Sequence, residues 1–229
     1  MSLSRAQSPF HFSTLASLTQ VTGRKAKNLK ELLLHLKEAP LSVTYHHTHR
    51  FLKQHHFLSP EPPNDFAYWV NRALQHERLA ESLASIDTVQ FTRVHDLRDQ
   101  IVRTIENYLA RNPSDRDAVP GDEFYFMQSI SFVLATPYEA WDLEQFADCL
   151  KKVSIYSLYY HIFDAKLRLR QMNDFSFWLE TSLEESALAA SISHLDPYTQ
   201  TLEGLRSRII RLVERRIKEI SPVKEAAHV

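Results

Sequence analysis

The residues best suited to chemistry are histidines, and five of the twelve in this 229-residue chain fall within residues 45–56. The stretch has the character of a helix, on which positions three or four apart share a face. His46 and His49 would therefore lie side by side. Neutral imidazole is a common ligand of transition metals. The stretch predicts either a metal-binding face or a polar helix face, and the sequence leaves both interpretations open.

A comparison of the two halves of the chain supplies further candidate ligands. Tyr45-His46 matches Tyr160-His161 after a one-residue insertion, and His49 then matches Asp164. Imidazole and carboxylate together suit Zn, Fe, Mn or Ni. If the two helices pack together, four side chains would converge on a divalent transition metal. The predicted metal ligands are His46, His49, His161 and Asp164.

Other side chains of the two matched segments are given supporting or surface roles. Tyr45 and Tyr160 would orient the ligands from behind. The remaining histidines of the stretch have no counterpart in this alignment and are predicted to lie on the surface: His47, His55 and His56.

The match between the halves extends beyond the histidines. The block from Asn64 to Val70, NDFAYWV, matches NDFSFWL from Asn173 to Leu179. Tryptophan occurs only three times in the chain, so a matched tryptophan is a specific signal. We expect an internal duplication, whose two units would pack about a pseudo-two-fold axis with a groove between them.

The pattern predicts a mainly α protein built from two tandem, internally duplicated helical units. The chain has three glycines, too few for a sheet protein rich in tight turns. Leucines at helical spacing predict a helix over residues 22–38, and Thr136-Pro137-Tyr138-Glu139 reads as a capping box. The predicted domains are residues 8–112 and 122–220, and 221–229 is predicted to be a disordered tail.

The repeated Asn-Asp and tryptophan positions have simple structural interpretations. Asn64 and Asn173 each precede an apolar helical pattern and are predicted helix N-caps. Trp69 and Trp178 lie within apolar stripes, so we expect them in the core.

Composition argues against several classes of function. A net charge of −1 gives no general attraction to nucleic acid or anionic lipid. The lone Cys149 excludes an intramolecular disulfide and any multi-cysteine metal site. No apolar run is long enough to span a membrane, and we expect a cytoplasmic protein. No nucleotide-binding loop or nucleophile elbow is present.

The stretch YHHTHRFLKQHHFLSPEPPNDFAYWV, from Tyr45 to Val70, resembles the signature of an uncharacterised bacterial family, a domain of unknown function. The resemblance covers most of the chain and implies a soluble protein with no assigned activity. It therefore supplies no catalytic residues.

Two functions remain open. The first is a non-catalytic binding or regulatory protein that holds an unknown small molecule or protein in the groove between the units. The second is a metal-binding protein, including a metal-dependent enzyme, with its site on the paired Tyr-His helices. Acid–base catalysis by His161 with Glu180, Asp164 or Asp174 is a weaker interpretation. The distance between His46 and His161 separates the two functions, and the sequence does not indicate the oligomeric state.

Overall fold

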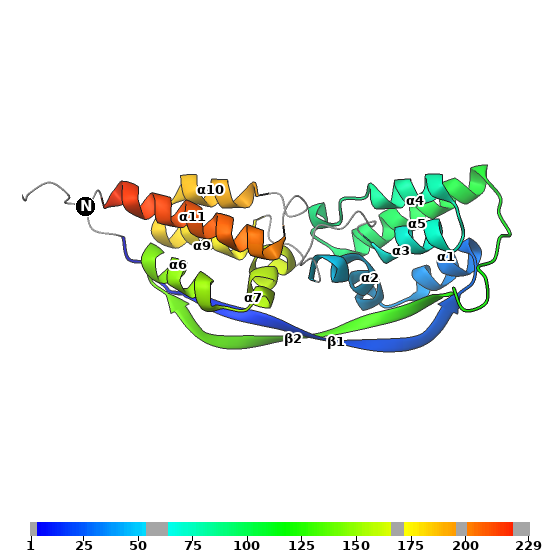
Figure 1. Ribbon diagram of the computed structural model, residues 1–229, viewed down its shortest axis with the longest axis horizontal. Helices are drawn as coiled ribbons and strands as arrows, with labels where there is room; N and C mark the ends of the chain where they lie inside the picture. Colours follow the sequence, from blue (N-terminus) through cyan, green and yellow to red (C-terminus); the bar gives the residue numbers. More distant parts are fainter. Residues whose placement is uncertain (1–3, 54–63, 166–171, 196–200, 222–229) are drawn as a thin grey trace, which may run out of the picture.

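The structure is a computed structural model that describes residues 4–53, 64–165, 172–195 and 201–221. The chain has an α/β fold, 59% helical and 18% strand. Its two long strands, β1 (Phe10–Ala26) and β2 (Phe124–Ala140), pair as a two-stranded antiparallel ribbon. The helices lie on one side of this ribbon in two groups, one over each end (Figure 1).

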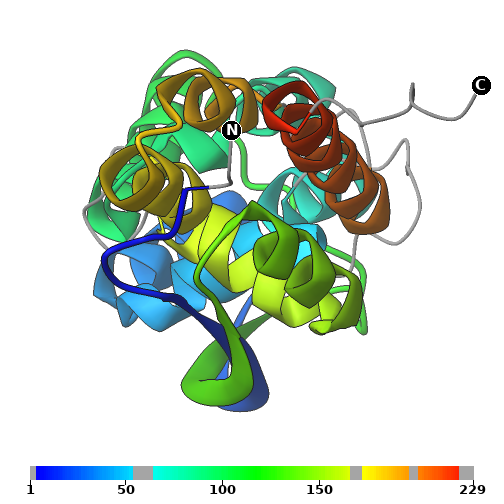
Figure 2. The ribbon, with the colours of Figure 1, turned by 90° about the vertical axis from the view of Figure 1, so that its left-hand side faces the viewer.

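Each helical group comes from one half of the sequence. The first group comprises α1 (Leu29–Glu38), α2 (Leu41–Lys53), α3 (Asp65–Arg72), α4 (Glu77–Ala84), the short 3-10 helix η1 (Thr88–Gln90) and α5 (Val94–Arg111). The second comprises α6 (Leu143–Lys152), α7 (Ile155–Tyr159), the π-helix η2 (Tyr160–Asp164), α9 (Asp174–Leu183), α10 (Ser186–Ser193) and α11 (Leu202–Ile220). Viewed along the long axis, the ribbon projects below the helices (Figure 2).

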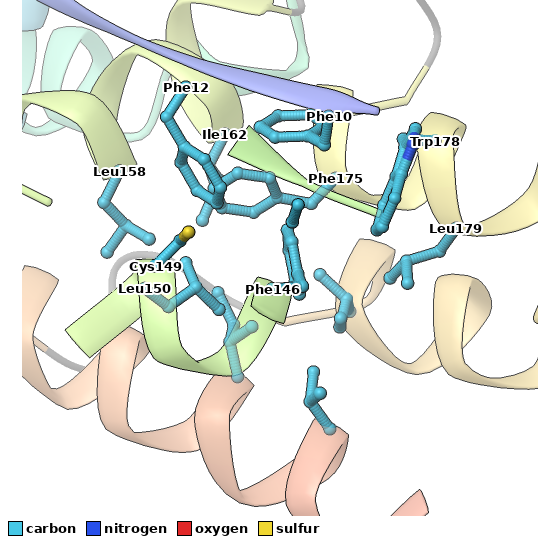
Figure 3. Close-up of a cluster of buried hydrophobic side chains, with 14 of the residues drawn as sticks. Phe10, Phe12, Phe146, Cys149, Leu150, Leu158, Ile162, Phe175, Trp178 and Leu179 are labelled. Atoms are coloured by element: carbon cyan, nitrogen blue, oxygen red, sulfur yellow. The ribbon is translucent and has the colours of Figure 1, made fainter. Parts of the chain in front are cut away.

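The start of β1 is buried in the core of the second helical group. Phe10 and Phe12 pack among Phe146, Phe175 and Trp178 (Figure 3). The ring of Phe10 meets those of Phe175 and Trp178 edge to face, at centroid distances of 5.3 and 5.6 Å. Such aromatic pairs stabilise a core beyond the area they bury. The first strand is therefore anchored by helices that follow it by more than a hundred residues.

The start of β2 is buried in the core of the first helical group in the same manner. Phe124 stacks on Phe66 and meets Trp69 edge to face. The Trp69 indole donates to the carbonyl of Asp122, just before β2. The Trp178 indole likewise donates to the carbonyl of Ser8, just before β1. Each core therefore combines the helices of one half of the sequence with the first residues of the strand that belongs to the other half. The structure buries both tryptophans, as the apolar stripes predict.

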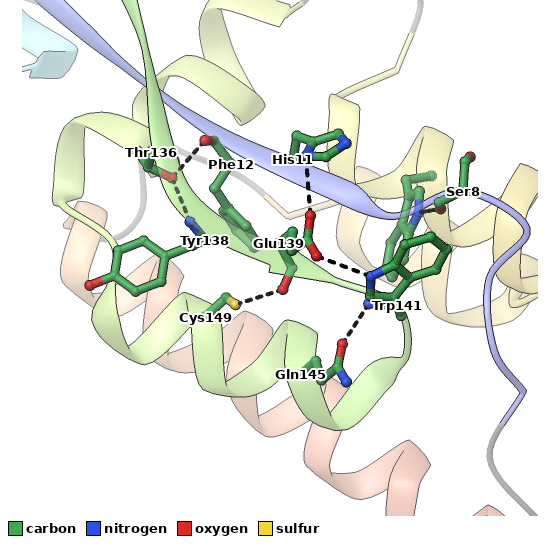
Figure 4. Close-up of polar contacts among 10 residues, drawn as sticks. Ser8, His11, Phe12, Thr136, Tyr138, Glu139, Trp141, Gln145 and Cys149 are labelled. Atoms are coloured by element: carbon green, nitrogen blue, oxygen red, sulfur yellow. Dashed lines mark hydrogen bonds and ion pairs between the residues drawn. The ribbon is translucent and has the colours of Figure 1, made fainter.

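Near the C-terminal end of β2, side-chain hydrogen bonds connect this strand to β1 and to α6 (Figure 4). The Thr136 hydroxyl donates to the carbonyl of Phe12 across the ribbon, 2.6 Å away. The Cys149 thiol donates to the backbone carbonyl of Glu139. Asp142 then caps α6 by accepting from the backbone N–H of Gln145.

The prediction of a mainly α protein is wrong, and an internal duplication is not shown. Residues 22–26 and 136–140 continue the two strands, so the helices predicted to start at Thr22 and Thr136 begin instead at Leu29 and Leu143. The scarcity of glycine led to the wrong fold class, because few glycines argue only against tight turns and not against strands. Five α-helices lie between the strands in the described part of the chain, and such a connection needs no hairpin turn.

Other local predictions are confirmed. Asn64 accepts from the backbone N–H of Ala67, and Asn173 accepts from that of Ser176, so both act as N-caps. The domain boundaries at 8–112 and 122–220 stay predictions, and residues 222–229 of the predicted tail lie outside the described residues.

Candidate functional site

A buried histidine joins the ribbon to the second helical group. Nε2 of His161 accepts the backbone N–H of Ser13, 2.9 Å away, and Nδ1 lies 2.9 Å from Oδ2 of Asp174. Since the backbone N–H can only donate, Nε2 carries no proton and Nδ1–H donates to the carboxylate. The side chain is 5% exposed. Both ring nitrogens of His161 are therefore engaged in hydrogen bonds, one to β1 and one to α9.

His47 makes the corresponding contacts with β2. Its Nε2 accepts the backbone N–H of Met127 at 3.0 Å, and Nδ1 lies 2.8 Å from Oδ2 of Asp65. The side chain is 3% exposed, so the prediction that His47 lies on the surface is wrong. His47 is thus the residue whose contacts correspond to those of His161. It lies one residue after His46, the position that the Tyr-His match selects. His55 and His56 lie outside the described residues.

Tyr45 stands where the two helical groups meet. Its hydroxyl donates to Oδ1 of Asp164, 3.1 Å away, and lies 3.2 Å from the hydroxyl of Tyr159, which then donates to it. The ring of His49 stacks on that of Tyr45 at a centroid distance of 4.8 Å. Burial, followed by the nearby Tyr159 and Asp164, raises the pKa of the Tyr45 phenol. Tyr45 is therefore a neutral hydrogen-bond donor to the carboxylate.

The structure distributes the four predicted metal ligands over different contacts. Nδ1 of His46 lies 2.9 Å from the Ser129 hydroxyl, and Nδ1 of His49 lies 2.8 Å from the Thr48 hydroxyl. Asp164 accepts from Tyr45, while His161 packs against aromatic rings of the second core.

Each predicted supporting residue contacts a different predicted ligand: Tyr45 donates to Asp164, and Tyr160 packs edge to face on His161. Within the described residues, no group of three or more His, Cys, Asp or Glu side chains is arranged to hold a metal ion. The metal site therefore stays a prediction, which elemental analysis of untagged protein tests.

A pocket of about 530 Å³ lies between β1 and the helices α2 and α7, near the middle of the ribbon. Its walls come from both halves of the chain. The described residues lining it are Thr14, Leu15, Ala16, Ser17, Thr19, Tyr45, His46, Ser129, Ser154 and Tyr156. Hydroxyl groups dominate this set, and it contains no Asp, Glu, Lys or Arg. The histidine predicted as a metal ligand at position 46 thus lines a neutral, polar pocket.

The pocket lies along the outer edge of β1. The N–H of Ser13 bonds to His161 and its C=O accepts from the Ser157 hydroxyl, so both groups point away from β2. Along an antiparallel strand, this orientation recurs at every second residue. Pairing with β2 is unbroken from Ser13 to Val21. The N–H and C=O groups of Leu15 and Thr19, which line the pocket, therefore point away from β2 as well.

The comparisons with known proteins place the chain in a family. The model of the family of unknown function DUF5752 matches residues 7–214. The chain belongs to this family. One solved structure similar to this DUF5752 chain is that of OrfY from Thermoproteus tenax, with 30% sequence identity and a TM-score of 0.79. The match covers 93% of this chain and 98% of that one.

The resemblance to a domain of unknown function is therefore confirmed, while the bacterial origin and the signature stay predictions. No curated protein matches this DUF5752 chain. Within the described residues, none of the helices combines the length and apolar character needed to cross a bilayer.

Proposed function

We propose that this DUF5752 protein is a non-catalytic, cytoplasmic binding protein that holds a small uncharged molecule in the pocket beside β1. One observation carries the proposal: an open strand edge, with backbone groups of Leu15 and Thr19 directed away from β2, borders a pocket rich in hydroxyl groups. Strand edges bind ligands through the N–H and C=O groups that the sheet leaves available. Such an edge suits a ligand that both donates and accepts hydrogen bonds.

The charge of the lining selects the class of ligand. A charged molecule would lose hydration on entering the pocket, and the described lining residues offer no ionised side chain to compensate. A ligand with hydroxyl or amide groups would exchange its bonds to water for bonds to the strand edge and the hydroxyls of Thr19, Ser129 and Ser154. The rings of Tyr45 and Tyr156 provide an apolar wall beside these groups.

The position of the pocket also supports a regulatory role. Its walls include β1 from the start of the chain, α2 from the first helical group and α7 from the second. A bound molecule would contact all three and favour the arrangement in which they surround it. A ligand can shift a conformational equilibrium only by its differential affinity for the two states. Because the ligand would contact both helical groups, its affinity would be higher for the arrangement in which they surround it than for one in which they do not.

The proposal is tested by thermal unfolding with a panel of small molecules that contains neutral hydroxyl- and amide-bearing compounds beside anionic and cationic ones. A ligand at 100 times its Kd stabilises by about 2.7 kcal/mol, which raises the Tm of a chain this size by about 5–11 °C. We expect such shifts among the neutral compounds. Shifts confined to charged compounds would contradict the proposal.

A pair of variants locates the binding. Thr19 pairs with Ser129, whose hydroxyl reaches His46, so Thr19 faces the same side of the ribbon. Thr19→Trp would fill the pocket and abolish the shift. Val119→Trp, at an exposed loop residue outside the pocket and the ribbon, is the control and keeps it. An equal shift in both variants would place the ligand elsewhere.

A further inference from the structure

The middle of the ribbon carries an exposed apolar face. Leu18 pairs with Ile130, Ala16 with Phe132, and Thr14 with Leu134. Paired residues of an antiparallel ladder project from the same side, so these side chains share one face. Four of them are large, apolar and well exposed: Leu18 (62%), Ile130 (40%), Phe132 (48%) and Leu134 (51%). We call these four residues the ribbon patch.

The ribbon patch lies in an uncharged part of the surface. The sequence has no Asp, Glu, Lys or Arg from Phe12 to Gly23 or from Phe124 to Tyr138. Natural proteins protect exposed strands against pairing with other chains by placing charged residues, often lysine, along them. The ribbon lacks that protection over the whole of its middle. A matching partner surface must itself be uncharged and apolar, as another ribbon patch is.

The exposed area of the patch suits an interface between copies. From their exposed fractions, the four side chains present roughly 400 Å², within the range of about 300–600 Å² covered by the largest apolar patch of a typical monomer, a patch that is often functional. A standard interface buries about 800 Å² on each partner. The patch would supply about half of this area.

We propose that the ribbon patch is the dimer interface between two copies of this chain. The two ribbons stack face to face about a two-fold axis, so that each ribbon patch covers the other. The pair Ser17–Ser131 lies near the middle of the ladder, with Leu18 and Ile130 beside it on one side and Ala16 and Phe132 on the other. The axis passes through this region, because the apolar side chains extend from it in both directions along the ribbon.

The test is the mass of the full-length protein in solution, measured by sedimentation equilibrium from about 1 to 100 µM, the range in which a micromolar Kd is resolved. The wild type is expected to reach twice the chain mass of 26.7 kDa. Phe132→Lys is expected to weaken dimerisation at least 100-fold, because the two-fold axis brings two added charges into one interface. Val119→Lys, on an exposed loop residue outside the ribbon, is the control and should dimerise as the wild type does.

Two outcomes would overturn the proposal: a wild type that stays monomeric across this range, or a dimer that Phe132→Lys leaves intact. If Phe132→Lys does not fold, cysteine cross-linking gives an independent result. Leu18→Cys should form an interchain disulfide under mild oxidation, whereas Val119→Cys should not, and the native Cys149 is buried. Equal cross-linking of both variants would also contradict the ribbon interface.

Discussion

Replacing His161 with phenylalanine tests whether the buried histidines hold the ribbon to the helices. The substitution preserves an aromatic ring among its aromatic neighbours but removes both ring nitrogens. The N–H of Ser13 loses its acceptor and Asp174 loses the Nδ1–H donor. Each buried polar group left without its bond costs about 1–3 kcal/mol, and more when it is charged. We expect a loss of about 3–5 kcal/mol in the free energy of unfolding, a large part of the stability of a typical domain.

Urea denaturation followed by circular dichroism measures this loss, and thermal unfolding should show a Tm lower by about 6–20 °C. His11→Phe is the matched control, because His11 lies on β1, the strand that His161 contacts, with a side chain that is 70% exposed, and its effect should stay within about 0.5 kcal/mol. His47→Phe should also destabilise, through Met127 and Asp65, but by less, because the Asp65 side chain is 41% exposed and can bond to water. A His161→Phe protein within 1 kcal/mol of the wild type would refute the reasoning.

Three further predictions concern single side chains. Burial raises the pKa of the Cys149 thiol, so alkylation by iodoacetamide at pH 8 should be much slower in the folded protein than in urea. Asn173→Ala removes the cap bond to Ser176 and should cost about 1 kcal/mol in urea denaturation, whereas no change would contradict the capping role. Desolvation, followed by Arg116, lowers the pKa of His76 from 6.5. The unfolded chain therefore takes up this proton first, and stability should fall as the pH drops below about 6.5. That fall should be smaller in His76→Gln, as a pH series of melts would show.

The sequence predicts well those features whose signals are local. An Asn followed by an apolar helical pattern marks the caps at Asn64 and Asn173, because a cap bond spans only three residues. The tryptophans lie on apolar stripes of single helices, and both are buried. The histidine helix is also local, and α2 forms within the described residues as expected.

The ribbon could not be predicted in this way because its pairing joins distant residues and its middle is exposed. A half-buried strand shows an alternation of apolar and polar residues. From Ser13 to Val21 most of β1 is open to solvent or lines the pocket, so burial imposes no such alternation. The signal that the sequence did offer was the uncharged, Ser- and Thr-rich stretch from Phe12 to Gly23, bounded by Phe-x-Phe.

The choice of His46 instead of His47 has a similarly specific cause. Matching the dipeptide Tyr-His required a one-residue insertion, which put His46 opposite His161. A gapless alignment, at the offset of 114 residues that relates Thr22 to Thr136, puts His47 there instead. Only contacts across the fold, to Met127 and Asp65, show that His47 has the structural role.

The most direct test of the proposed function is native mass spectrometry of untagged protein under gentle desolvation. The wild type should carry a small uncharged molecule that denaturation releases for identification. Val119→Trp should retain the same mass increment, and Thr19→Trp should lose it while its circular dichroism stays native. A Thr19→Trp protein that carries the same molecule in the same amount would contradict binding in the pocket beside β1.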